Sequence, residues 1–353
     1  MRWRAFSIVV LVVGGLLGGP GVAGACACGA VLADTRLEPV QETALVEIGA
    51  GTEAITLNIA TEPGSGATEA AFVMPVPARA AFELADGQVF AELDRFSQPR
   101  VAYRDVARDL DGDGAGEAPA GDAASDVTVT DQVTVGPYEV AQLTGTDATS
   151  VADWLHANGF MLPDTIGARL SPYLAAGWLV VAVHLVPTTA DFGLPPMRLS
   201  FPTTEPVYPM RLSSAAETAQ PTRLYVLADH RTDASSPAPD GPDPDVTFAG
   251  WLGPDDLAGY PLLAEHVTGR QFLTRYDGRF EPRLITDDIH LTKAATDQTH
   301  REVVYRTRYV DDDSTTTVIW LLAIVAAALV IATLTVLLRR SGRPRADPAG
   351  QPR

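Results

Sequence analysis

The sequence predicts an α+β protein: a mainly antiparallel β-sheet ectodomain with a small helical insertion, plus one C-terminal transmembrane helix. Three observations support this fold class. Segments that alternate apolar and polar residues recur along most of the chain, with the period of half-buried strands. Helical spacing is concentrated between residues 147 and 177. An uncharged run from Val318 to Leu338 is long and apolar enough to cross a bilayer.

The N-terminal half of the body is mostly extended. Alternation predicts strands at Thr43–Ile48 and Ala54–Ile59. A third strand ends at Phe72–Pro77, because proline cannot donate a hydrogen bond to a ladder. A short helix is expected over Phe90–Phe96, where apolar residues recur after one helical turn, and Val133–Leu143 resumes strand structure.

The helical insertion follows that last strand. Asp147 or Thr146 can cap a helix whose buried face carries Val151, Trp154 and Leu155. The Asn-Gly pair after this helix suits the left-handed turn that commonly ends one.

A second helical segment precedes the most apolar strand of the body. Ile166–Leu170 makes a helical turn, and Ser171-Pro172 predicts the start of a separate helix, with serine as the cap and proline in the first position. Gly177 ends it. Trp178–Val186 is almost entirely apolar, as a central strand covered on both faces would be. Further strands are predicted at Met197–Phe201, Tyr208–Leu212, Arg223–Ala228 and Phe272–Tyr276, with a tight turn between two strands at Arg275–Arg279.

Two apolar segments predict where the protein resides. Residues 1–25 have the basic start, apolar centre and small-residue end of a secretory signal peptide, with cleavage expected before Cys26. An uncleaved anchor is the alternative, but the apolar run is short for a bilayer. Aspartates at 311–313 precede the second segment and arginines at 339–340 follow it. The positive-inside rule therefore places the C-terminus in the cytoplasm and the body outside the cell membrane.

These boundaries define the predicted organisation. It comprises a signal peptide (1–25), an extracytoplasmic α+β domain (26–310), a juxtamembrane linker (311–317), a single-pass transmembrane helix (318–338) and a basic cytoplasmic tail (339–353). Two low-complexity segments interrupt the domain, namely an acidic insertion (105–126) that is expected to be disordered and a Pro/Asp-rich loop (233–247).

The charge of the chain argues against nucleic acid as a partner. The formal net charge is −18, from 26 basic and 44 acidic residues. The leader contributes +2 and the tail +4, which leaves −24 for the rest. An ectodomain with this acidic excess repels phosphate backbones and has few cations from which to build a basic patch.

Cys26 and Cys28 are the only cysteines, and both would lie at the N-terminus of the exported chain. Export favours oxidation, so they are candidates for a disulfide. Lipidation of Cys26 is a second alternative, although Ala23 is a poor match to the leucine that usually opens a lipobox. A soft-metal site is a third, although two thiolates are fewer ligands than a closed structural site needs.

The acidic insertion contains the start of a calcium-binding loop. Asp109, Asp111 and Asp113 supply carboxylates at the first, third and fifth positions, and a glycine follows at the fourth and sixth. The twelfth position should carry a bidentate glutamate but holds Ala120. The interpretation favoured is a solvated acidic loop, with weak calcium binding through these three aspartates as the alternative.

No catalytic motif stands out. The chain lacks a Gly-x-Ser-x-Gly elbow and a His-Glu-x-x-His helix. The nearest approach to an acid/base or metal cluster is formed by Asp229-His230 and by Asp287-Asp288-Ile289-His290, although such pairs at strand ends more often make surface hydrogen bonds. His184 lies within an apolar strand and is expected to be a hydrogen-bonded core residue rather than a ligand.

Several blocks of sequence, in order, resemble the bacterial domain of unknown function 2330. They are FVMPVP, ELDRFSQPRV, VGPYEVAQL, DWLHANGF, GWLVVAVHL, MRLSFPTTEPVYPMRLS, LYVLADHR and FLTRYDGRF, together with the cysteine cluster after the leader. The similarity covers Cys26 to about His290. It implies a secreted or membrane-anchored protein of unknown activity, and it brings no catalytic residue with it.

Three functions remain open at this point. The first is a non-enzymatic envelope-surface module that binds another envelope protein or a small ligand, with no cofactor and with the bilayer as a partner through Val318–Leu338. The second is a cell-surface hydrolase or metal-dependent enzyme. The third is a redox or metal-handling protein that uses Cys26 and Cys28.

Overall fold

The computed structural model describes residues 22–26, 28–33, 39–61, 70–106, 128–135, 137–145, 147–185, 196–309 and 313–341. These residues belong to two units. The first comprises residues up to 100 together with 116–302, and the second comprises 101–115 and 303–353. The predicted class is confirmed, since the fold is mixed α+β with mostly antiparallel sheets and one apolar C-terminal helix.

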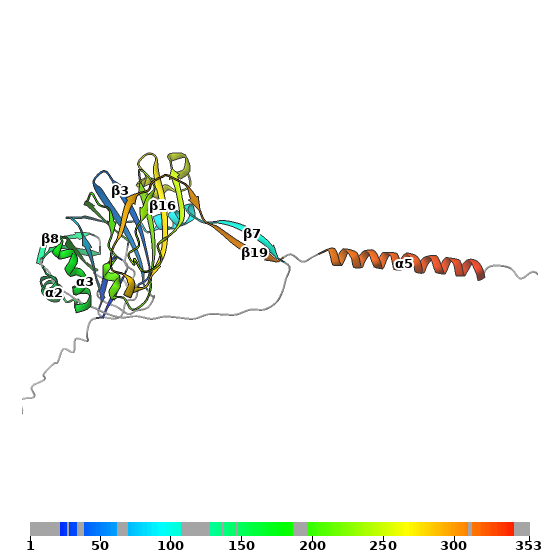
Figure 1. The fold of residues 1–353 in the computed structure, drawn as a ribbon, viewed down its shortest axis with the longest axis horizontal. Helices are drawn as coiled ribbons and strands as arrows, with labels where there is room; N and C mark the ends of the chain where they lie inside the picture. The colour runs from blue at the N-terminus through cyan, green and yellow to red at the C-terminus, as the bar shows by residue number, and fades with distance from the viewer. Residues whose placement is uncertain are drawn as a thin grey trace, which may run out of the picture. The chain divides into compact units, whose positions relative to one another are not determined.

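An eight-stranded sheet forms one layer of the first unit, with β3 and β16 within it (Figure 1). In spatial order its strands are β18 (His300–Arg301), β15 (Asp245–Leu252), β16 (Gln271–Phe280), β13 (Gln220–Ala228), β3 (Pro39–Gly49), β4 (Thr52–Thr61), β11 (Met197–Pro202) and β6 (Ala81–Leu84). Neighbours are antiparallel except β3 and β13, which run parallel. Because β3 and β13 run parallel, the C-terminal ends of these two strands lie at the same edge of the sheet.

A six-stranded antiparallel sheet forms the second layer. In spatial order its strands are β1 (Val22–Ala25), β2 (Ala30–Ala33), β5 (Ala70–Val76), β10 (Leu179–Leu185), β9 (Tyr138–Thr144) and β8 (Thr128–Val135). The edge strand β1 consists of residues that the sequence assigns to the signal peptide. Cleavage after Ala25 stays a prediction, and it would remove β1 and make β2 the edge of this sheet.

Side-chain alternation explains the layers. In β3, Ala44 and Val46 pack against the six-stranded sheet, while Leu45 faces the opposite side. In β10, Val181 and Val183 face the core between the sheets, while the alternate residues contact the helices. Successive side chains of a strand point to opposite faces, so a continuous apolar run contributes buried side chains to the core on each face of the sheet.

Short helices cover the outer faces of both sheets. The six-stranded sheet packs against α2 (Ala148–Ala157) and α3 (Asp164–Ala175), which lie side by side in Figure 1. The eight-stranded sheet packs against α1 (Gln88–Phe96), α4 (Pro261–His266) and the 3-10 turn η2 (Pro254–Leu257). Two further 3-10 turns are η1 (Arg211–Ala215) and η3 (Pro282–Leu284).

A small third sheet completes the first unit. It has the order β12 (Val207–Tyr208), β17 (Ile289–Lys293) and β14 (Thr232–Ala234), and both pairs are antiparallel.

The second unit contains a two-stranded ribbon and a long helix. The ribbon is formed by β7 (Arg100–Val106) and β19 (Val303–Tyr309), and the helix is α5 (Asp313–Ser341). The apolar part of α5 is Val318–Leu338, with a mean hydropathy of 2.9. This is the segment that the sequence predicts to cross a membrane.

Most predicted elements of the body are present. The strands expected at residues 43–48 and 54–59 form the hairpin β3–β4, and Trp178–Val186 contains the central strand β10. Asp147 caps α2, because its carboxylate accepts a hydrogen bond of 2.9 Å from the Ser150 amide. The acidic insertion is outside the described residues apart from Asp105 and Val106, which belong to β7.

The prediction of two helices around Ser171 is wrong. The helix α3 runs through without a break and contains Pro172. The Ser171 hydroxyl does not cap a new helix but donates to the Gly167 carbonyl, at 3.0 Å. A helix can continue past proline where packing of its apolar face outweighs one lost backbone hydrogen bond, and Leu170 and Tyr173 provide that packing.

The tight turn predicted at Arg275–Arg279 is also wrong, because β16 continues through it to Phe280. A Cβ atom on Gly278 would lie 2.6 Å from the Phe280 ring, so the glycine makes room for that ring rather than for a turn. The strand predicted at Tyr208–Leu212 is shorter than expected. It ends at Tyr208, because Pro209 has no N–H group with which to continue the ladder.

Candidate functional site

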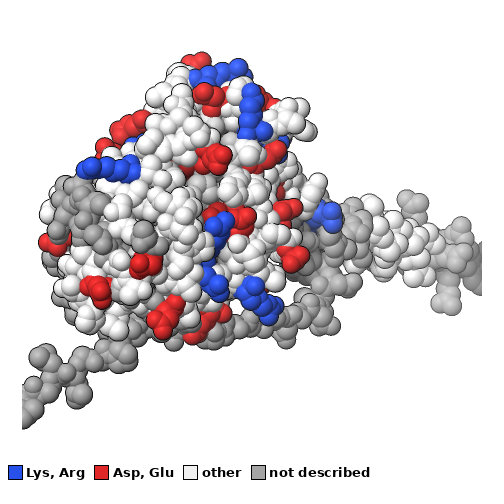
Figure 2. All heavy atoms as spheres, turned by 60° about the vertical axis from the view of Figure 1, so that its left-hand side comes forward, with Lys and Arg blue, Asp and Glu red and all other residues white. Residues whose placement is uncertain are grey.

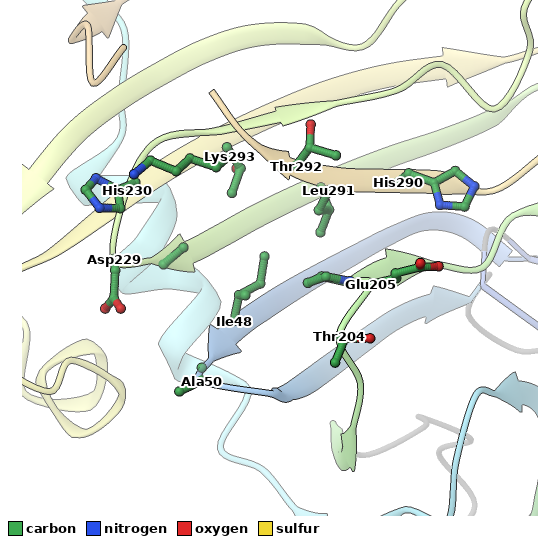
Figure 3. A pocket seen from close by; sticks show the side chains of 14 residues that line it. Ile48, Ala50, Thr204, Glu205, Asp229, His230, His290, Leu291, Thr292 and Lys293 are labelled. Atoms are coloured by element: carbon green, nitrogen blue, oxygen red, sulfur yellow. The ribbon is translucent and has the colours of Figure 1, made fainter. Parts of the chain in front are cut away.

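A pocket of about 670 Å³ opens at the edge of the first unit where β3 and β13 end (Figure 3). Four segments line it: Ile48–Ala50, Thr204–Pro206, Ala228–His230 with Thr232, and His290–Lys293. Because β3 and β13 run parallel, their carboxyl ends meet at one edge of the sheet and leave room for the other two segments. The volume is in the range of small-molecule sites.

One end of the pocket carries a histidine held by an aspartate. The Nδ1 atom of His230 lies 3.0 Å from Asp297 Oδ2, and the other oxygen of Asp297 accepts a 2.9 Å hydrogen bond from the Arg231 amide. The hydrogen bond with His230 is the main reason that the pKa of Asp297 is below its ordinary value. Asp297 therefore fixes both the ring and the backbone at the end of β13.

The second histidine, His290, also has an aspartate beside it. Its Nε2 atom lies 3.7 Å from Asp287 Oδ1, and Asp287 accepts a hydrogen bond from Arg211. Burial by itself would raise the pKa of Asp287, but the hydrogen bonds from Arg211 and from the Asp288 amide, together with the charge of Arg211, more than offset this and the pKa is lowered. The neighbouring Asp288 is buried and accepts hydrogen bonds from the Tyr173 hydroxyl and from the Met210 amide at 2.7 Å.

Charged groups of both signs lie at the two ends of the pocket. In Figure 3 the Lys293 side chain extends toward His230, with Asp229 nearby, while His290 and Glu205 are at the opposite end. The floor between them includes Ile48 and other apolar side chains. Acidic and basic side chains are interspersed in the same way on the surface in Figure 2. The pocket thus offers an apolar centre and mixed-charge ends rather than a field of one sign.

Glu53 is buried behind the segment that forms one wall. It is fully shielded from solvent, and its Oε2 atom accepts a hydrogen bond of 3.1 Å from the Val207 amide. Its Oε1 atom is buried without a hydrogen-bond partner among the residues described. Burial raises the pKa of Glu53 to about 8, so the carboxyl group is largely protonated at neutral pH.

Cys26 and Cys28 form a second polar cluster, within the core between the two sheets. Both side chains are fully buried and both thiols are free. Glu42 accepts a hydrogen bond of 2.9 Å from the Cys28 amide and another from the Tyr208 hydroxyl. Burial raises the pKa of both thiols and of Glu42, which disfavours the reactive thiolate.

A family model described as an uncharacterized protein conserved in bacteria, domain of unknown function 2330, matches residues 22–292. The chain belongs to this family. No curated protein and no solved structure gives a significant match. The family match includes every segment of the pocket except Lys293, which lies one residue beyond it. The family description assigns no activity, so function must be argued from the site.

In this family member, the fold brings together two predicted sites that the sequence separates. Asp229, His230 and His290 all line the one pocket, while Asp287 and Asp288 support it from outside. No cluster of three or more His, Cys, Asp or Glu side chains suited to a metal occurs in the described part of the chain. Asp109, Asp111 and Asp113 lie outside that part, so calcium binding there stays a prediction.

From the sequence, His184 is expected to be a hydrogen-bonded core residue, but it belongs to neither buried core of the sheet it lies in. Its Nδ1 atom lies 3.5 Å from Glu139, and its ring packs edge-on against Phe160 with 5.0 Å between the ring centres. It is half-buried and does not line the large pocket.

Sequence reasoning missed Lys293 and the 204–206 segment as parts of a site. Lys293 is the only lysine in the chain, but this fact does not indicate which other residues lie beside it in the fold. Pro206 carried a clearer signal, because a proline next to a short strand marks a place where a ladder stops.

Proposed function

We propose that this protein is a non-enzymatic binding module of the bacterial envelope, held in the cell membrane by α5, with the pocket at the ends of β3 and β13 as its ligand site. The observation that carries the proposal is the pocket itself, which combines an apolar floor with convergent polar groups from four segments. Its fixed polar groups, such as the His230–Asp297 pair, can orient a ligand without a catalytic partner.

The proposed topology puts the pocket outside the cytoplasm. The signal peptide at residues 1–25 and the arginines that follow Leu338 both favour export of the body and retention of the tail. The apolar span of the helix has 21 residues, enough for a hydrocarbon core of about 30 Å at about 1.5 Å per residue.

A ligand screen on the full chain in lipid nanodiscs tests the binding function. The probes are a panel of amino acids, short peptides, sugars and nucleotides, and the readout is the thermal midpoint. A ligand at about 100 times its dissociation constant stabilises the native state by about 2.7 kcal/mol. We expect at least one probe to raise the midpoint of the natural protein.

Two tryptophan variants locate the effect. Thr204→Trp fills the pocket from an exposed position of its wall, whereas Thr296→Trp places the same side chain at an exposed position outside the lining. The thermal shift should disappear in Thr204→Trp and persist in Thr296→Trp. Equal shifts in both variants, or no shift in the natural protein, would contradict the proposal.

A cell-surface hydrolase is the second candidate, and one observation favours it. Asp297 holds Nδ1 of His230 as an orienting carboxylate holds a catalytic histidine. A general base must also have a nucleophile within hydrogen-bond reach, and among the described residues no hydroxyl or thiol is bonded to His230. Hydrolysis of a chromogenic ester or peptide that is lost in His230→Gln would establish this function instead.

Redox or metal handling by Cys26 and Cys28 is the third candidate. Reactive cysteines are exposed and have a lowered pKa, whereas both of these thiols are buried and have a raised pKa. The cluster therefore favours a structural role, and the disulfide stays a prediction.

A further inference from the structure

The backbone of β17 is fully hydrogen-bonded on the side that faces β14, and only partly hydrogen-bonded on the opposite side. Toward β14, the Ala294 amide donates to the Arg231 carbonyl at 2.8 Å, and the Ser235 amide donates to the His290 carbonyl at 3.0 Å. In an antiparallel ladder, alternate residues direct both backbone groups to the same neighbour. His290, Thr292 and Ala294 therefore point toward β14, and the backbone groups of the residues between them point the other way.

On that other side, β12 covers only the first part of β17. It pairs with Ile289 and His290, and the last bond runs from the Leu291 amide to the Pro206 carbonyl, at 3.0 Å. Pro206 has no N–H group, so it cannot donate back to the Leu291 carbonyl. Lys293 lies further along the same open side.

The chain before Pro206 turns away instead of continuing the ladder. The Thr203 amide donates to the Gly51 carbonyl at 3.1 Å, and the Glu205 amide donates to the Thr203 hydroxyl at 3.1 Å. Within the ranges that the structure describes, neither backbone group of Lys293 has a hydrogen-bond partner on this side. The place where a longer β12 would have run is the pocket, since Thr204, Glu205 and Lys293 all line it.

Open backbone groups in a pocket select a ligand that has a backbone of its own. An extended peptide can accept from the Lys293 amide and donate to the Lys293 carbonyl, as in strand addition at a sheet edge. Its alternate side chains would face the apolar floor, which includes Ile48 and Ala228. The Lys293 ammonium lies with Asp229 at one end and the Glu205 carboxylate lies with His290 at the other, so the two ends complement a dipolar peptide better than a polyanion.

We propose that the pocket binds an extended peptide segment, which pairs as a strand with Leu291–Lys293 and continues the β12–β17 ladder that Pro206 interrupts. The inference rests on the proposed function, because it names the class of ligand for the same pocket. It goes further in placing recognition on the backbone of β17 rather than on side chains alone.

The test uses peptides selected from a phage-displayed library of random 12-residue sequences on the full chain in lipid nanodiscs. Lys293→Pro removes the open N–H group at the end of a strand, where proline is tolerated. Lys293→Ala removes the side chain and keeps the N–H group. Both variants lose the Lys293 side chain, so their difference reports the N–H group alone. We expect affinity for the selected peptides to be about tenfold or more lower in Lys293→Pro than in Lys293→Ala, since about 1.4 kcal/mol corresponds to a tenfold change.

A peptide modification gives the same test without changing the protein, in case Lys293→Pro fails to fold. N-methylation of alternate amides in a selected peptide should abolish binding in one register and spare it in the other, because only alternate amides face β17. Peptides that bind with equal affinity to both variants and tolerate methylation in both registers would overturn strand pairing. Strand pairing would also be overturned if every selected peptide bound Thr204→Trp as tightly as it binds the natural protein.

These outcomes separate the two proposals. A sugar or nucleotide whose thermal shift is lost in Thr204→Trp, together with no pocket-dependent peptide, would support the ligand site and reject the peptide. Loss of every pocket-dependent shift would reject both.

Discussion

At the scale of single residues, the buried carboxyl groups are the most informative. Glu53 is held in the core with one oxygen bonded to the Val207 amide and the other without a partner among the residues described. Alternation puts Glu53 on the same face of β4 as Ile55 and Leu57, which belong to the core. The side chain is nevertheless one that is almost never fully buried. The 204–207 segment, far away in the sequence, supplies the Val207 amide that bonds to it, and local patterns do not contain that contact.

Glu53 leads to a prediction of pH-dependent stability. Its pKa is about 8 in the folded protein and 4.5 ordinarily, so above pH 4.5 the unfolded chain releases a proton that the folded chain keeps. The free energy of unfolding therefore falls as the pH rises from about 4.5 to 8, by about 3 kcal/mol at pH 7 from this group alone. Glu53→Gln should remove this loss and raise the thermal midpoint by several degrees at pH 7.5, with little change at pH 4.5.

The matched control is Glu205→Gln, which neutralises an exposed carboxyl group in the same wall. It should leave the pH profile of the thermal midpoint as it is in the natural protein. If Glu53→Gln were less stable than the natural protein at pH 7.5, burial of the Glu53 carboxyl group would not lower the free energy of unfolding, and the prediction would be wrong.

At the scale of secondary-structure elements, local patterns predicted the strands better than their ends. Strand β4 alternates apolar and polar residues and β10 is a nearly continuous apolar run, so both were predicted. The parallel pairing of β3 with β13 was the part that no local pattern could predict. At Pro172 and Gly278, tertiary packing decided that the proline or glycine does not interrupt its element, whereas at Tyr208 the missing N–H group of Pro209 ended the strand early. The pocket was missed for a related reason, because its four segments meet only through sheet topology.

The proline within α3 leads to a second stability prediction. Pro172 is exposed in the last part of a helix, so its ring adds little burial, while it removes a backbone donor to Ala168. Pro172→Ala should therefore raise the free energy of unfolding, by up to about 3 kcal/mol. Pro163→Ala at the N-terminal end of the same helix is the control, since no helical hydrogen bond is missing there. Urea unfolding of both variants would compare them.

At the scale of the whole molecule, the topology remains to be measured. Protease added to intact cells should digest the body, while an epitope tag placed after Arg353 should survive, because the positive-inside rule puts the tail in the cytoplasm. The N-terminal peptide of the purified protein, expected to start at Cys26, can be identified by mass spectrometry from the same cells. A tag that antibodies reach on intact cells would reverse the orientation.

The parallel pairing of β3 with β13 also affects how the chain must fold. Residues 42–47 pair with residues 222–227, so the eight-stranded sheet cannot be completed until most of the body has been synthesised. Such non-local pairing slows folding because loop-closure entropy is lost before the contacts form. At synthesis rates of about 5–20 residues per second, the β3 edge waits roughly ten seconds or more for its partner. During that interval the edge of an apolar strand is unpaired, and a chaperone that covers this edge would protect the chain against aggregation.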